Sequence, residues 1–115
     1  MKYFRILHRG ECRHVPPAAA VERAKQAKLE LDAAGAGLEG ATIVYDETST
    51  RLESGKNLVE RVICLELVAP FTELYDTEAR VKQRLYLAFE GAISAGAPAP
   101  LRAVEYEYGD GGCAR

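Results

Sequence analysis

The segment 57–70 (NLVERVICLELVAP) constrains the fold more than any other, because it is the longest apolar and β-branched run in the chain. Such a run predicts a strand in the middle of a sheet. Alternate residues of a strand point to opposite faces. The predicted faces are Val59, Ile63, Leu65 and Leu67 on one side, and Glu60, Val62, Cys64 and Glu66 on the other. Two glutamates on the second face predict that only the first packs on helices.

Five other segments have the periodicity of strands or helices. Alternation of apolar residues indicates strands, whereas apolar residues at steps of three and four indicate helices. A proline pair opens the first helix and Gly35 ends it. The predicted elements are a strand at 2–9, a helix over 17–34, strands at 41–47 and 57–70, a helix that begins between residues 72 and 77 and ends near 94, and a strand at 101–108.

The segments around the second strand carry two further expectations. Simple alternation places Ile43 and Tyr45 on one face of this strand and Val44 on the other. The polar segment 48–56 ends in turn residues, so we expect a long hairpin loop there.

The order of elements predicts the fold class. It resembles the split βαβ arrangement of ferredoxin-like folds, a two-layer α+β protein (βαββαβ) whose four-stranded antiparallel sheet has both helices on one face. We expect residues 1–108 to form a single domain and residues 109–115 a flexible C-terminal tail. This architecture serves enzymes, metal carriers, RNA binders and regulatory domains alike, so it predicts no function by itself.

Cysteine usage and hydropathy predict the cellular setting. The chain has three scattered cysteines, Cys12, Cys64 and Cys113, and its first residues lack the apolar core of a secretory signal. These features predict reduced thiols in the cytoplasm. There is also no apolar run long enough to span a membrane.

Charge argues against nucleic acid as the main partner. The net charge is −2, and the glutamates of the central strand would repel phosphate. Base stacking on the sheet would also need aromatic residues on both middle strands, yet only Tyr3 is available there. Residues 1–28 carry seven Lys or Arg against two Glu, while the rest is acidic. This separation of positive and negative charge suits self-association. Alternatively, the charged residues simply solvate different helix faces.

Candidate chemistry is sparse. The only metal-ligand types close in sequence are His8, Cys12 and His14, which would need a bend at Gly10 to converge. The same residues could form a Cys and His nucleophilic pair. The string GAGLEG at 35–40 follows a helix and precedes a strand, the reverse of a dinucleotide site. We therefore expect no cofactor.

A small-molecule ligand would fit best between the second helix and the sheet. Three tyrosines could supply hydroxyl groups beside apolar walls there. They are Tyr75, Tyr86 and Tyr106. A small enzyme of the dimeric ferredoxin-like kind with a pocket using His8, Cys12 or His14, or a ligand- or metal-binding protein of that kind, is an alternative interpretation.

The favoured interpretation is a small protein-binding module that forms a homodimer through the open sheet face. An apolar centre with charged edges is typical of an interface, and a two-fold axis would match Arg with Glu. Within one chain, Glu60 and Glu66 are expected to pair with Arg5 and Arg9. The predicted interface residues are Tyr3, Arg5, Leu7, Arg9, Glu60, Val62, Cys64 and Glu66. There are two alternatives. One is a monomer whose open face is salt-bridged, and the other is a subunit of a ring or filament that uses the 48–56 loop.

Overall fold

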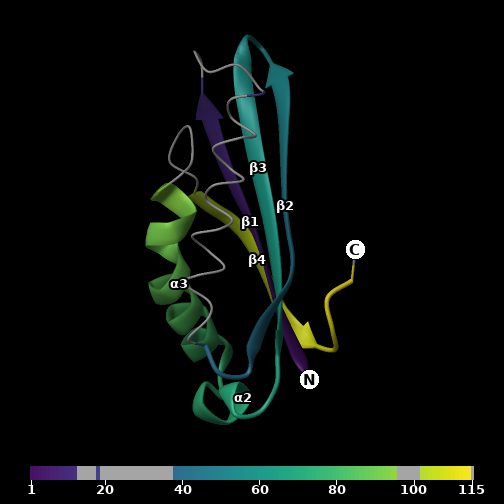
Figure 1. Cartoon of the computed structure of the whole chain (residues 1–115), viewed down its shortest axis with the longest axis vertical. Coiled ribbons are helices and arrows are strands. Elements are labelled where there is room, and N and C mark those ends of the chain that lie inside the picture. The colour runs from purple at the N-terminus through teal and green to yellow at the C-terminus, as the bar shows by residue number, and fades with distance from the viewer. Residues whose placement is uncertain (13–17, 19–37, 96–101, 115) are drawn as a thin grey trace.

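A four-stranded antiparallel sheet with the strand order β2-β3-β1-β4 dominates the protein (Figure 1). The computed structural model describes residues 1–12, 18, 38–95 and 102–114. The strands are β1 (Lys2–Cys12), β2 (Ala41–Glu53), β3 (Lys56–Leu67) and β4 (Arg102–Asp110), and the helices are α2 (Phe71–Leu74) and α3 (Glu78–Ala95). The prediction that the 57–70 run forms a central strand is confirmed, because β3 pairs with β1 and β2.

The predicted ferredoxin-like βαββαβ fold, with two helices packed on one face, is wrong. The structure is mostly strand, and α2 and α3 follow one another between β3 and β4. Of the two described helices, α3 runs along a face of the sheet, while the four-residue α2 lies at one end (Figure 1). The helix predicted over 17–34 lies outside the described residues.

The high strand content of the structure comes in part from the 48–56 segment. It is a continuous β-hairpin rather than a loop, because β2 runs to Glu53 and β3 begins at Lys56. Only Ser54 and Gly55 form the turn, with φ angles of 51° and 76°. Two positive φ values in a two-residue turn match the right-handed twist of the strands. The polar residues of this segment therefore belong to an exposed hairpin.

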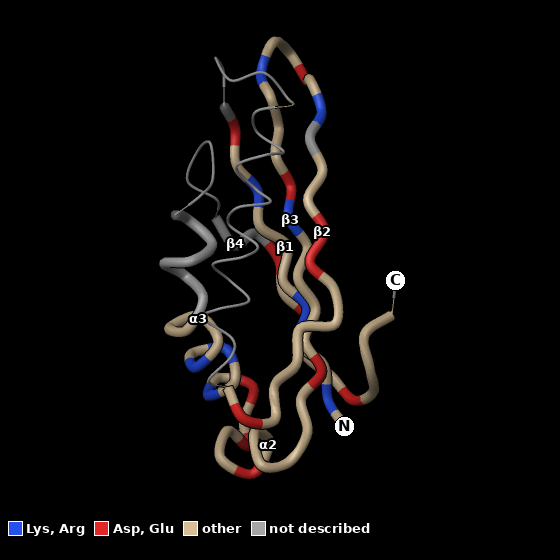
Figure 2. The backbone as a smooth tube through the Cα atoms, in the orientation of Figure 1, with Lys and Arg blue, Asp and Glu red and all other residues tan. Residues whose placement is uncertain are grey.

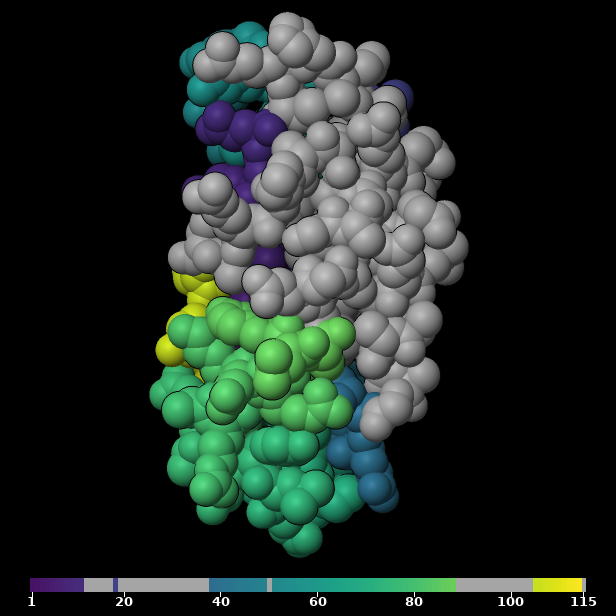
Figure 3. Space-filling view, turned by 90° about the vertical axis from the view of Figure 1, so that its left-hand side faces the viewer, coloured from purple at the N-terminus to yellow at the C-terminus, as the bar shows by residue number. Residues whose placement is uncertain are grey.

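The core lies between the sheet and α3. Phe4 and Ile6 of β1, together with Val59, Ile63, Leu65 and Leu67 of β3, pack against Val81 and Leu85 of the helix. The β3 residues of this set are the predicted helix-facing side of the central strand, and each is at most 1% exposed. Figure 3 looks onto the helical side, where α2 and α3 form the lower part of the surface. In the described ranges, no helix combines the length and apolar character needed to cross a membrane.

A glycine allows the start of β2 to approach α2 closely. Gly40 has a φ angle of 84°, and its carbonyl accepts a hydrogen bond of 2.8 Å from the amide of Val68. A Cβ atom here would lie 2.7 Å from both the amide nitrogen of Phe71 and the carbonyl oxygen of Val68. Glycine is therefore required both for the backbone conformation and for the contact.

Candidate functional site

The sheet face turned away from α3, called the open face below, carries every predicted interface residue. Directly opposite residues in an antiparallel pair share a face. The register of β1 against β3 pairs Tyr3 with Glu66, Arg5 with Cys64, Leu7 with Val62, and Arg9 with Glu60. Phe4 and Ile6, which alternate with these residues, point into the core. The structure therefore places the eight residues on one face of the sheet.

Ion pairs surround an apolar centre on the open face. Leu7 and Val62 lie opposite one another and are half-buried. The Arg9 Nε atom lies 3.2 Å from a Glu60 carboxylate oxygen, as expected, whereas Arg5 lies 3.6 Å from Glu107 of β4. Lys and Arg are interspersed with Asp and Glu along the strands (Figure 2).

A hollow of about 420 Å³ lies beside Val62. Its walls come from Val62 and Glu60 of β3 and from residues 47–49 of β2. Because β2 is the outer strand on this side of the sheet, the hollow is open at the sheet edge. A protruding side chain of a partner could therefore enter next to the apolar centre.

The C-terminal tail, residues 111–114, crosses one end of the open face. A disulfide bond joins Cys113 to Cys64 of β3, with Cα atoms 6.0 Å apart. The hydroxyl of Tyr45 donates a 3.2 Å hydrogen bond to the carbonyl of Ala114, and the amide of Gly111 donates one of 2.9 Å to the carbonyl of Met1. The prediction of reduced thiols is thus wrong for this pair. Cys64 is fully buried, so it offers no contact surface to a partner.

A β-bulge in β2 brings a carboxylate into the core, which simple alternation missed. Ile43 pairs with Leu65, but Tyr45 pairs with Cys64, so Val44 is an extra residue. Ile43 and Tyr45 therefore lie on opposite faces, contrary to prediction. From the bulge onward the faces are exchanged, and Asp46 points to the helix side.

Asp46 forms a buried, bidentate ion pair with Arg61. The Arg61 Nε and Nη2 atoms lie 2.8 and 2.5 Å from the two carboxylate oxygens. The side chains are 0% and 1% exposed for Arg61 and Asp46, respectively. An arginine within an apolar strand was the available sequence signal, because a buried charge requires a partner.

His8 lies opposite Arg61 and is also buried, at 3% exposed. Burial, followed by the charge of Arg61, lowers the pKa of His8 from 6.5 to about 4, and the charge of Asp46 opposes this only in part. The imidazole is therefore neutral at pH 7. Its Nδ1 atom has no hydrogen-bond partner within the described ranges. Such a group is placed for packing in the core rather than for exchanging protons with a substrate.

The predicted metal ligands are not brought together in the described part of the chain. His8 points into the core, the Cys12 side chain is not described, and His14 lies outside the described residues. No group of three His, Cys, Asp or Glu residues there could hold a metal ion. The metal site and the Cys and His pair stay predictions.

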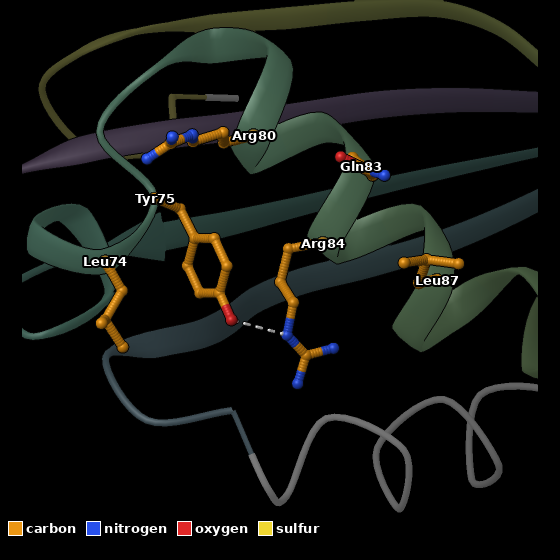
Figure 4. A pocket seen from close by; sticks show the side chains of 6 residues that line it. All are labelled: Leu74, Tyr75, Arg80, Gln83, Arg84 and Leu87. Atoms are coloured by element: carbon orange, nitrogen blue, oxygen red, sulfur yellow. Dashed lines mark hydrogen bonds between the residues drawn. The ribbon is translucent and has the colours of Figure 1, made fainter.

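Among the described residues, Tyr75 lies apart from Tyr86 and Tyr106, and the ligand site between them stays a prediction. Tyr86 and Tyr106 come together around Lys82, whose Nζ atom lies 5.5 and 4.2 Å from the two ring centres. Burial, then the proximity of Tyr106, raises the pKa of Tyr86. Tyr75 instead accepts a 3.1 Å hydrogen bond from the Nε atom of Arg84, in a separate pocket at the start of α3 (Figure 4).

Among the predicted sites whose residues are all described, the residues of the open face share one side of the sheet. This face combines a half-buried apolar centre with charged surroundings, a composition that is typical of interfaces. Comparison with known proteins provides no further assignment, because no family model, curated protein or solved structure matches the chain.

Proposed function

We propose that this protein is a binding module that self-associates, with two copies meeting through their open faces. The observation that carries the proposal is the half-buried Leu7 and Val62 pair, surrounded by ion pairs on a face opposite the helical layer. An apolar core with a polar rim is the usual anatomy of an interface. A two-fold axis through this centre would place the same surface of each copy against the other.

The charges of the open face are compatible with this arrangement. The ion pairs of Arg5 and Arg9 are partly exposed, so each contributes only about 0 to 1 kcal/mol within one chain. The arginines can therefore turn to glutamates of a second copy at little cost. Complementary charges would then select the relative orientation of the two copies.

The size of the face predicts a transient association. With strands about 4.8 Å apart and about 3.3 Å per residue, four strands of about eight residues cover about 500 Å². Stable interfaces bury about 800 Å² per partner. An interface of this size lies at the small end, which is typical of transient association, so the population of the dimer should depend on protein concentration.

The experiment compares two charge-introducing variants by analytical ultracentrifugation over a range of concentrations. Val62→Glu places a carboxylate at the apolar centre. The control, Leu52→Glu, changes a 70% exposed strand residue opposite Asn57, on the other face of the sheet. Wild type and the control should shift from monomer to dimer mass as concentration rises, while Val62→Glu stays monomeric. A wild type that is monomeric throughout, or a Val62→Glu variant that still dimerises, contradicts the proposal.

We further propose that the protein acts in an oxidising compartment, rather than in the cytoplasm predicted from the sequence. The support is the Cys64–Cys113 disulfide, which ties the C-terminal tail to the open face. Structural disulfides persist in oxidising compartments and are rare in the cytosol.

A further inference from the structure

The junction of α2 and α3 contains a pocket that is separate from the open face. Its volume is about 350 Å³, within the size range of small-molecule sites. The residues that line it are Leu74, Tyr75, Arg80, Gln83, Arg84 and Leu87 (Figure 4). Of the lining residues that the structure describes, two are arginines and none is acidic, so this part of the pocket favours an anion.

Arg84 is held in a fixed orientation at the centre of the pocket. Its Nε atom donates to the Tyr75 hydroxyl at 3.1 Å. The Tyr75 ring in turn packs on Phe71, with ring centres 4.7 Å apart, and Phe71 is only 1% exposed. A buried aromatic residue therefore anchors the hydrogen bond that orients the guanidinium group.

The two terminal nitrogens of Arg84 remain available. Within the described ranges its only hydrogen bond is the one from Nε, and Figure 4 shows the terminal nitrogens directed away from Tyr75. A guanidinium edge with parallel N–H groups matches a carboxylate in a bidentate manner. Arg80 is different, because Asp76 already accepts a hydrogen bond from it at 3.2 Å. Among the described lining residues the pocket thus holds one uncommitted cation, which suits a monoanion.

Apolar side chains lie on either side of this cation. Leu74 of α2 is 67% exposed and Leu87 of α3 is 73% exposed. Arg84 and Leu87 are three residues apart on the helix and therefore share a face. We propose that this pocket binds a small monocarboxylate with an apolar body, its carboxylate on Arg84 and its body against Leu74 and Leu87.

The experiment titrates the protein with phenylpropionate and follows the methyl resonances of Leu74 and Leu87 by NMR. Two probes separate the parts of the ligand: phenylpropanol lacks the charge, and inorganic phosphate lacks the apolar body. Phenylpropionate should bind at least about tenfold more tightly than phenylpropanol, since a charge-assisted hydrogen bond of about 1.5 to 3 kcal/mol corresponds to that factor or more. It should also bind more tightly than phosphate, because phosphate buries no apolar surface against the two leucines. Equal affinity for phosphate or phenylpropanol, or an absence of shifts at both leucines, overturns the proposal.

Substitutions test the role of Arg84 in the same titration. Arg84→Leu should weaken phenylpropionate binding at least about tenfold. Arg84→Lys keeps the charge but loses the bidentate edge, so it should give an intermediate loss. The control is Arg51→Leu, at an exposed arginine that pairs with Glu53 in the hairpin, and it should bind as wild type does. Unchanged binding by Arg84→Leu with intact sheet resonances overturns the proposal. Neither outcome depends on dimerisation, so this site and the proposed function can fail separately.

Discussion

Arg61 is the largest of the fully buried side chains in the described part of the chain, and Asp46 neutralises it. A buried ion pair adds little net stability, because desolvation offsets the attraction, but an unpaired member would cost about 3 to 5 kcal/mol. The pair forms only if β2 has its bulge between Ile43 and Tyr45. We infer that the pair specifies the register of β2 against β3 more than it stabilises the fold.

The neighbouring His8 should make stability depend on pH. The pKa of His8 is about 4 in the folded protein, whereas the ordinary value of 6.5 applies in the unfolded chain. Between pH 4 and pH 6.5 the unfolded chain therefore binds a proton that the folded protein does not. Stability should therefore rise with pH across this window and reach its full value above about pH 6.5. Between pH 7 and pH 5 wild type should lose about 2 kcal/mol of unfolding free energy through this residue.

Urea unfolding of wild type and His8→Leu at both pH values measures this contribution. Carboxylates titrate in both proteins, so their effect cancels in the difference. The variant should lose about 2 kcal/mol less than wild type on acidification. An identical loss in the two proteins would show that His8 is not the responsible group.

At the scale of elements, two glycines with similar backbone angles should differ in their tolerance of alanine. Gly55 in the hairpin turn has a φ of 76° and no atom within 4 Å of an added Cβ. Gly55→Ala should therefore lower the free energy of unfolding by only about 1 kcal/mol, the cost of placing alanine in a left-handed backbone conformation. Gly40→Ala adds a backbone clash between the start of β2 and α2, so it should cost at least twice as much. Urea unfolding at one pH checks both, and equal costs would contradict this account of Gly40.

The long hairpin and the bulge also show where sequence patterns were insufficient. Apart from Leu52, residues 48–53 of β2 are polar, and polarity alone does not distinguish a strand from a loop. The bulge exchanges the two faces of β2, and an alternation rule contains no signal for one extra residue. Both features depend on pairing with β3, which no local pattern encodes.

At the scale of the whole molecule, the disulfide links a central strand to the C-terminus across a separation of 49 residues. Closing a loop of this size restricts the unfolded chain, which stabilises the folded protein by about 2 to 4 kcal/mol. Wild type should therefore unfold at a lower urea concentration under reducing conditions, and Cys113→Ser should unfold there without reductant. Cys12→Ser serves as control and should respond to reductant as wild type does. A midpoint that reductant does not change would contradict the stabilising role.

The sequence by itself determined the central strand, the division of that strand into an apolar face and a half-polar face, and the helix that follows it. These features depend on residue periodicity, which acts over a few neighbouring positions. Only the tertiary structure decided that Cys64 bonds Cys113, that Asp46 meets Arg61, and that Tyr75 orients Arg84. Each of these contacts joins separate elements, so it depends on strand register and helix placement. The predicted ferredoxin-like fold was wrong for the same reason, because the arrangement of elements in space is a property of the packed chain.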